Sequence, residues 1–392
     1  MLEFALIYAH GLLASASIGI ISFYYAQICA EYALGPVAGT VIISMFSLGG
    51  AIGGVFAGVY LVRTHLHRTL CAGSALLALS SLGSMVLRGG AAFFALRVFA
   101  SFAFIVVVTV IPSIFARYDD GRRVVGLALW GAYLPLGIAL GNGLSALVLR
   151  GWDVSWRATL AMHGMVLAAA TAALAARAHR GDVERGHHDE VPVGSLRPRL
   201  RRLGRASFAY AAGFGTFTAV FLITAGILPR TLVEIGGLSP SNAGIAASFV
   251  LAFSTLGSFA VLYLVPRIRS AQLLFGIGFA GSALASFGLY AMARGPNAVA
   301  CSAVAIIVIS GLIPAAVFAY VPRIVDHHED VGTLNGLLTQ FGCIGSLVGP
   351  PLLGWWIQRF SYSTGWIPFT ALCAVGFSLF MPSLQKMSLR HT

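Results

Sequence analysis

The sequence predicts an all-α membrane protein with 12 transmembrane helices arranged as two pseudo-symmetric six-helix bundles. Of its 392 residues, 58% are hydrophobic and only 10% are charged, whereas a soluble domain is about half apolar and one quarter charged. The mean hydropathy is +0.87. The apolar residues also fall into runs of membrane-spanning length, since one span requires roughly 20 residues.

Twelve such runs follow one another along the chain, separated by short polar segments. They predict transmembrane helices at 4–30, 37–62, 69–87, 91–115, 124–149, 157–177, 207–229, 243–265, 271–292, 297–321, 332–358 and 364–384. The first run is not preceded by a basic segment, so we expect a retained span and not a cleaved signal peptide. The five cysteines lie singly in apolar segments, which predicts packing residues.

The basic residues predict how the chain is oriented in the membrane. If the first helix runs outward, six arginines flank the outer side, at positions 88, 150, 157, 230, 294 and 359. Eighteen lysines and arginines then flank the inner side, eight of them arginines between positions 177 and 205. Because basic loops are retained in the cytoplasm, we expect both termini on that side of a bacterial inner membrane. Topology thus accounts for the net charge of +12 without nucleic-acid binding.

The longest polar segment divides the spans into two sets of six. We expect residues 1–178 to form an N-terminal six-helix bundle, 179–206 a cytoplasmic linker and 207–392 a C-terminal six-helix bundle. The arginine-rich end of the linker, 197–205, is either an ordinary basic connection or an amphipathic helix lying on anionic headgroups.

The two halves carry related short patterns at a nearly constant offset. At offsets of 202 and 206, the matched residues are Tyr8 with Tyr210, Ile111-Pro112 with Ile313-Pro314, Arg117 with Arg323, Asp120 with Asp326, and Gly126 with Gly332. Their conserved order indicates duplication of a six-helix unit. Because each unit has an even number of spans, the copies share one orientation and are related by an axis along the membrane normal.

Several segments carry a resemblance to a known family. They are Gly58 with Arg63 and Arg68 between the second and third spans, Arg97 in the fourth, the Gly131–Gly143 glycine-proline run in the fifth, Ser155-Trp156-Arg157 opening the sixth, and Gly345-x-x-x-Gly349-Pro350 in the eleventh. Together with the duplication, they resemble the major facilitator superfamily over essentially the whole chain. The resemblance implies secondary transport by alternating access. The partial antiporter motif in the fifth span favours export.

Polar and aromatic side chains within the spans are the candidates for substrate binding or coupling. They are Arg97, His10, Tyr8, Tyr24, Gln27, Tyr133, Asn142, Asn335 and Gln340. Arg97 lies roughly six residues inside its span, or about 9 Å at 1.5 Å per residue. A charge at that depth requires a partner, water or the bundle interior. Arg97 either anchors an anionic substrate or tunes proton coupling. The alternative is a structural arginine that bonds to helix carbonyls or extends its charge outward to the membrane surface.

The acidic residues limit the possible coupling mechanisms. All 13 fall in loops or near helix ends, so no carboxylate is expected in the middle of the membrane. Proton coupling would therefore use His10, His163, Glu31 or the ionisation of the substrate, and histidine titrates in the required range. Each embedded polar side chain has the alternative role of an interhelical hydrogen bond.

Charged residues in repeated positions predict a cytoplasmic gate. They are Arg63, Asp119, Asp120, Arg267 and Asp326. Exposed pairs contribute only about 0–1 kcal/mol each, which suits a contact that forms and breaks during transport.

We therefore expect a secondary active transporter of a small organic solute, with export or antiport slightly favoured. The alternatives are import of an organic anion or neutral metabolite, and a membrane sensor that does not transport. We expect no enzyme activity, cofactor or metal site, because the histidine pairs lie in loops and no catalytic motif is recognisable. The expected partners are the lipid bilayer and a small molecule whose transport can be coupled to protons, and the expected state is a monomer.

Overall fold

The computed structural model describes residues 2–61, 64–152, 154–178, 196–264, 270–325 and 330–389. All of the regular secondary structure in these ranges is helical. The first half contains α1 (Leu2–Phe23), α2 (Tyr25–Glu31), α3 (Pro36–Ser44), η1 (Met45–Ser47), α4 (Leu48–Tyr60), α5 (Leu66–Val86), α6 (Gly90–Phe115), α7 (Asp120–Trp130), α8 (Tyr133–Trp152) and α9 (Trp156–Ala178). The second half contains α10 (Leu196–Glu234), α11 (Pro240–Ala252), α12 (Ser254–Leu264), α13 (Ala271–Phe287), η3 (Gly288–Met292), α14 (Pro296–Ser310), α15 (Leu312–Ile324), α16 (Val331–Arg359), η5 (Tyr362–Thr364) and α17 (Trp366–Leu389).

The predicted number of spans agrees with these helices. Eleven segments of the described chain are long and apolar enough to cross a membrane. The remaining predicted span, 243–265, is divided into the two shorter helices α11 and α12 by a turn at Phe253. The second, fifth and tenth spans are also interrupted, at η1, at Gly131-Ala132 and at Gly311. Apolar length predicts a crossing but does not reveal such interruptions.

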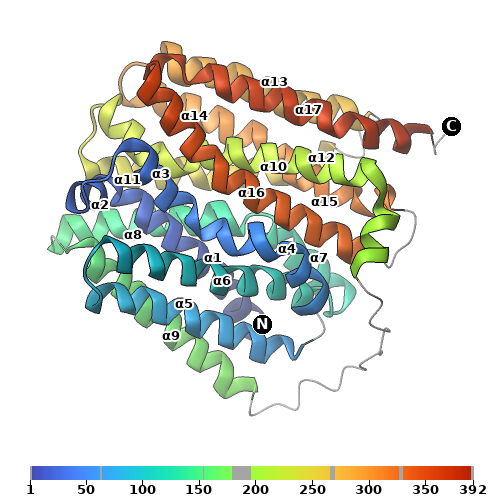
Figure 1. Cartoon of the computed structure of the whole chain (residues 1–392), viewed down its shortest axis with the longest axis horizontal. Helices are drawn as coiled ribbons and strands as arrows, with labels where there is room; N and C mark the ends of the chain where they lie inside the picture. The colour runs from blue at the N-terminus through green and yellow to red at the C-terminus, as the bar shows by residue number, and fades with distance from the viewer. Residues whose placement is uncertain are drawn as a thin grey trace.

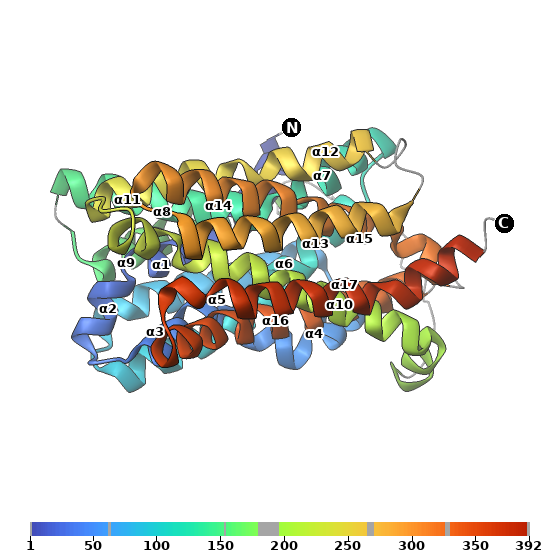
Figure 2. The same ribbon diagram turned by 90° about the horizontal axis from the view of Figure 1, so that it is seen from above.

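The helices form two bundles that lie side by side (Figures 1 and 2). The first bundle, α1 to α9, is coloured blue to green, and the second, α10 to α17, is coloured yellow-green to red. We call the end of the bundles at which α9 finishes and α10 begins the linker end, and the opposite end the far end. α1 runs from the linker end to the far end, and α3 and α4 together return.

One boundary differs from the prediction. α10 begins at Leu196, inside the segment 179–206 that we expected to be a linker. Gly204 interrupts its helical geometry with φ 68° and ψ 170°. That left-handed φ favours glycine, and it lets a short helix at 196–203 turn into the seventh span.

Glycines allow close packing at equivalent places in the two bundles. A Cβ atom added to Gly141 of α8 would overlap the carbonyl oxygen of Ala16 in α1. In the same way, a Cβ at Gly345 of α16 would overlap the carbonyl oxygen of Gly215 in α10. Small residues let membrane helices approach closely, so these glycine runs act first in packing. The equivalence supports the duplication seen in the sequence.

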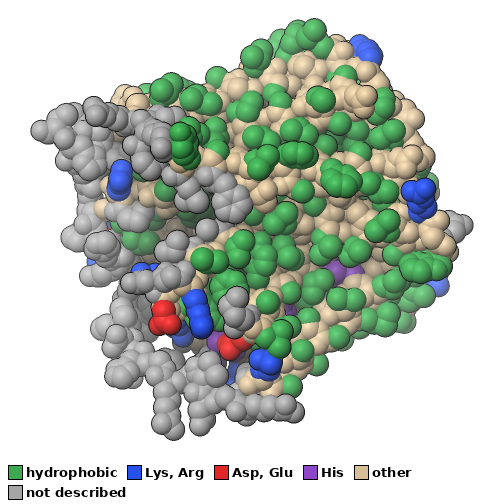
Figure 3. Space-filling view, turned by 180° about the vertical axis from the view of Figure 1, so that it is seen from behind, with side chains coloured by type: hydrophobic (Ala, Val, Ile, Leu, Met, Phe, Trp, Pro, Cys, Tyr) green, Lys and Arg blue, Asp and Glu red, His purple; other side chains and the backbone are tan. Residues whose placement is uncertain are grey.

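The outer surface is suited to lipid. Large apolar side chains are exposed on it, including Leu284 at 75% and Phe249 at 66%. Figure 3 shows one face covered mainly by hydrophobic side chains, with charged groups toward its margins. In water such a surface would be unstable, whereas in a bilayer it requires no partner.

Candidate functional site

Aromatic side chains of the first bundle gather where α7 meets α8. The Trp130 and Tyr133 rings are stacked, with centroids 3.8 Å apart and planes inclined by 4°. Tyr8 of α1 donates a hydrogen bond to the Leu129 carbonyl at 3.1 Å. The Trp130 ring also packs over Gly11 of α1. The predicted candidates Tyr8 of α1 and Tyr133 of α8 therefore both lie next to the interruption in the fifth span.

Gln340 joins the two bundles directly. Its amide Nε2 donates to the Ala51 carbonyl at 3.1 Å, and its Oε1 accepts from the Val55 backbone N–H at 3.3 Å. One helical turn farther along α16, Cys343 lies against Gly50 of α4. Gln340 thus satisfies polar groups at the α4–α16 contact, which is the interhelical role left open by the sequence.

Arg97 is the most unusual polar residue among the spans. Its side chain projects from α6 into the first bundle and the residue is only 5% exposed. Its Nε and Nη2 atoms are enclosed without a hydrogen-bond partner. The acidic side chains described by the structure, such as Glu31 and Asp119, lie near helix ends. A buried cation without a counterion is unfavourable, so this position favours an anion.

His163 lies next to the part of the bundle that carries Arg97. Its Nε2 atom is 2.7 Å from the Leu13 carbonyl of α1, so this nitrogen carries a proton, and Nδ1 is 3.2 Å from the Ser81 hydroxyl of α5. The neighbouring Ser80 donates to the Leu96 carbonyl at 2.8 Å. The sequence suggested His163 only as one of several coupling residues. The burial of His163 near Arg97 depends on how α1, α5 and α9 pack together, and the sequence did not reveal this packing.

Three predicted candidates lie away from the bundle interface. Tyr24 is 1% exposed, and its hydroxyl is 3.1 Å from the Thr159 hydroxyl inside the first bundle. His10 is buried between α1 and α9, with Nδ1 2.6 Å from the Leu6 carbonyl. Gln27 is exposed on α2, beyond the end of the first span. Tyr24 and His10 therefore make packing hydrogen bonds, and Gln27 lies outside the spans. The roles of these three residues in binding or coupling stay predictions.

The two candidate asparagines are more informative. Asn142 on α8 is fully buried, and both its amide oxygen and its amide nitrogen lack a hydrogen-bond partner. Asn335 on α16 is partly buried, and its Oδ1 atom is enclosed without a partner. Buried amide groups normally have hydrogen-bond partners, so we expect a water molecule or a ligand to bind at both positions. Their role in substrate binding stays a prediction.

The structure describes only part of the predicted gate. Arg63, Arg267 and Asp326 fall outside the described residues. Asp119 is exposed just before α7, and Asp120 is the first residue of α7. The gate therefore stays a prediction.

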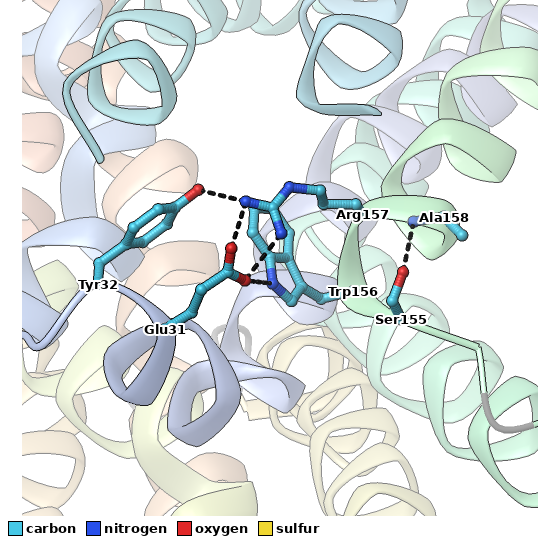
Figure 4. A network of polar contacts seen from close by, with 6 residues as sticks. All are labelled: Glu31, Tyr32, Ser155, Trp156, Arg157 and Ala158. Atoms are coloured by element: carbon cyan, nitrogen blue, oxygen red, sulfur yellow. Dashed lines mark hydrogen bonds and ion pairs between the residues drawn. The ribbon is translucent and has the colours of Figure 1, made fainter. Parts of the chain in front are cut away.

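A different polar network lies at the far end of the first bundle (Figure 4). The Glu31 carboxylate accepts hydrogen bonds from the Trp156 indole N–H and from Arg157, each at 2.8 Å. Arg157 also donates to the Tyr32 hydroxyl at 2.9 Å, and its guanidinium lies 4.3 Å from the centre of the Trp156 ring. The network ties the end of α2 to the start of α9. It also explains why an aromatic-arginine pair opens the sixth span.

The network predicts a dependence of stability on pH. The hydrogen bond from Arg157 holds the pKa of Glu31 below its usual range. The stabilisation is therefore complete above the unfolded carboxyl pKa of about 4 and is lost as the pH falls through the lowered folded pKa. We expect Glu31→Gln to unfold at a lower temperature than the wild type at pH 7, with the difference shrinking as the pH falls toward 3. Melting curves across this range measure it, and a difference independent of pH would contradict it.

The bundles touch one another at the far end. Ser22 of α1 donates to the Gly226 carbonyl of α10 at 2.6 Å. Arg230 of α10 donates to the Tyr25 hydroxyl at 3.1 Å and to Glu234 at 2.7 Å. On the other side of the interface, α8 packs closely against α11.

The same helix pair diverges toward the linker end. α7 and α12 continue α8 and α11, and among the described residues they make at most sparse contact. Figure 1 shows α8 next to α11. The α4–α16 contact continues toward the linker end, where Gly58 packs against Gly336. The bundles are therefore joined at the far end and partly separated at the linker end.

Known proteins agree with this architecture. A nucleoside transporter, NupG, has a solved structure that covers 97% of this chain and 99% of its own, with a TM-score of 0.76 and 12% identity. A bacterial homologue of the human lysosomal transporter Spinster, solved in an inward-facing and unoccupied conformation, covers 99% of this chain and 93% of its own, with a TM-score of 0.70 and 14% identity. At such low identity these similarities establish the fold.

Two sequence comparisons add to the structural ones. A nitrite extrusion protein of Bacillus subtilis (strain 168) is 27% identical over 241 residues, which are 58% of this chain and 55% of that protein. The match thus spans little more than half the length of that relative. The family model of the Major Facilitator Superfamily matches residues 8–350. The chain therefore belongs to the major facilitator superfamily.

Proposed function

We propose that this chain is a secondary transporter that carries a small anion across the bacterial inner membrane by alternating access, with export favoured. The observation that supports the substrate class is the buried guanidinium of Arg97, whose Nε and Nη2 atoms are enclosed without a hydrogen-bond partner. A bound anion would supply the counterion that the described spans lack. The partial similarity to a nitrite extrusion protein supports both the anionic class and the direction.

The positions of the basic residues support the proposed orientation. The connections at the linker end hold most of the arginines, so we place this end and both chain termini in the cytoplasm. The contacts at the far end then close the outer side, and the divergence of α7 from α12 faces inward. The site would therefore be loaded from the cytoplasm in this conformation, as an exporter requires. Residues 1–178 and 207–392 would be the rocking units of a monomer, with Asp119 and Asp120 in the inner gate.

His163 is our candidate for proton coupling. An anion held by Arg97 would favour the protonated imidazolium nearby, so binding of the anion and of a proton would assist each other. In contrast, the ring of His10 lies between α1 and α9, with its Nε2 atom 3.5 Å from the Thr171 hydroxyl. Coupling through His163 makes the direction of transport depend on the pH gradient.

Flux in proteoliposomes tests the proposed function. Purified full-length protein would be reconstituted, and uptake of nitrite, nitrate, formate and lactate would be measured with and without a pH gradient. We expect saturable flux of at least one of these anions, changed in rate by the gradient. Flux of neutral solutes without flux of any of these anions would contradict the anionic substrate class. Binding without any flux would favour the sensor alternative.

The contacts at the far end predict a shift in the conformational equilibrium. Tyr25→Phe removes the hydroxyl that accepts from Arg230 but keeps the ring, over which the guanidinium lies 5.1 Å from the ring centre. One hydrogen bond of about 1 kcal/mol corresponds to roughly a fivefold larger outward-open population. Distance measurements between spin labels placed on α2 and α11 would detect the change.

Two comparisons make that result interpretable. Arg230→Gln should give a larger shift than Tyr25→Phe, because it removes the cation from both Tyr25 and Glu234. Tyr60→Phe, at the exposed last residue of α4 and away from the far end, serves as the matched control. Equal distance distributions in the wild type and in Arg230→Gln would show that these contacts do not hold the outer side closed.

A further inference from the structure

A short basic helix precedes the seventh span. The segment 196–205 reads LRPRLRRLGR and contains five arginines. Leu203 is buried and Leu200 is partly buried, whereas Arg201 and Arg205 are exposed. The segment is therefore amphipathic, with its apolar side chains packed toward the protein and guanidinium groups on the outside.

The helix lies across the end of the bundle instead of continuing along a span. Figures 1 and 2 show this lime-green segment at the linker end, turned away from the direction of the rest of α10. The turn occurs at Gly204, with φ 68° and ψ 170°. Apolar residues follow at once, and Phe208 is 37% exposed on the outer surface. The segment thus lies at the level where the apolar surface of the protein ends.

An ion pair with a buried carboxylate anchors this helix to the second bundle. Arg202 donates to the Asp330 carboxylate at 2.9 Å, and the Asp330 side chain is only 4% exposed. Asp330 immediately precedes α16, so the pair ties the helix to the start of the eleventh span. Arg202 is therefore engaged by the protein, while Arg201 and Arg205 remain on the exposed side.

We propose that Arg201 and Arg205 form a binding surface for the phosphate groups of anionic phospholipids in the leaflet at the linker end. Guanidinium groups bind phosphate through two parallel hydrogen bonds, and anionic leaflets attract basic segments beside a span. Arg201 and Arg205 lie at the margin of the apolar surface, which favours a lipid over a soluble phosphate. A lipid whose headgroup binds there would place its acyl chains against apolar residues such as Phe208. Each arginine is expected to contribute about fivefold to the preference for anionic lipid.

Lipid titration of the purified full-length protein tests this surface. The protein in neutral detergent would receive phosphatidylglycerol or phosphatidylcholine of the same chain length, and the unfolding temperature would be followed. We expect phosphatidylglycerol to stabilise the wild type at lower concentration than phosphatidylcholine does. Arg201→Gln with Arg205→Gln should lower that preference by tenfold or more. Native mass spectrometry should show fewer retained phosphatidylglycerol molecules on the double variant.

The matched control removes two arginines from the far end. Arg150 and Arg359 are also exposed near the ends of spans, so Arg150→Gln with Arg359→Gln lowers the net charge equally. This control should keep the wild-type preference. The proposal is overturned if the Arg201/Arg205 variant keeps the preference, or if both double variants lose it alike. Inorganic phosphate reproducing the whole effect would also overturn it, because the surface would then bind a soluble ion.

Discussion

Replacing Arg97 with leucine should weaken anion binding strongly and at the same time stabilise the ligand-free protein. Charge-assisted hydrogen bonds contribute about 1.5–3 kcal/mol, so the loss of affinity should be roughly ten- to hundredfold. The opposite effect on stability follows from burial. Two guanidinium nitrogens are enclosed without partners. Even a buried ion pair can often be replaced by apolar side chains with a gain of about 1–4 kcal/mol, so removing a buried charge without a counterion should also be stabilising. A residue that serves function at the expense of stability produces this combination.

Thermal unfolding of purified protein measures both effects, with and without added anion. Arg97→Lys keeps the charge and should retain part of the anion-dependent stabilisation, whereas Arg97→Gln should lose it. Arg150→Gln removes an exposed charge near the end of α8 and should behave like the wild type. A large loss of stability in ligand-free Arg97→Leu would point instead to an arginine that holds the bundle together through contacts with helix carbonyls.

Gly345→Ala should disrupt the packing of the second bundle, although it adds only one methyl group. The new Cβ would overlap the carbonyl of Gly215, and this neighbour is backbone that cannot rotate away. Overpacking of this kind destabilises by about 1–3 kcal/mol, and a leucine at the same position should prevent folding. Gly141→Ala should have a comparable effect on the first bundle, because its Cβ meets the Ala16 carbonyl.

Gly53→Ala provides the matched control. It places the same methyl group in a transmembrane helix, but no atom lies within 4 Å of the added Cβ. We expect this variant to elute as monodisperse protein and to unfold at the wild-type temperature, while Gly345→Ala elutes with aggregates or unfolds earlier. If the two variants unfolded alike, the close approach of α16 to α10 would not be essential for the fold.

The spans, their number and the duplication follow from the sequence by itself. In hydrocarbon every backbone N–H and C=O group must be satisfied within the chain, so apolar runs of this length become helices. For this reason the predicted spans, such as 91–115 and 332–358, agree with α6 and α16 to within a few residues. The repeated Ile-Pro and glycine patterns likewise indicated two related halves. The resemblance to the major facilitator superfamily is confirmed by the family match over residues 8–350.

Only the tertiary structure decided which side each polar residue faces. The spans are apolar around most of their circumference, so periodicity does not distinguish a side that faces lipid from one that faces the bundle. Tyr24 and Gln27 therefore looked equivalent to Tyr133 in the sequence, although Tyr24 lies inside the first bundle and Gln27 is exposed on α2. The Glu31–Arg157 pair joins residues 126 positions apart, and no local pattern indicates such a contact. The isolation of Arg97 is likewise a property of packing, because its neighbours come from several helices.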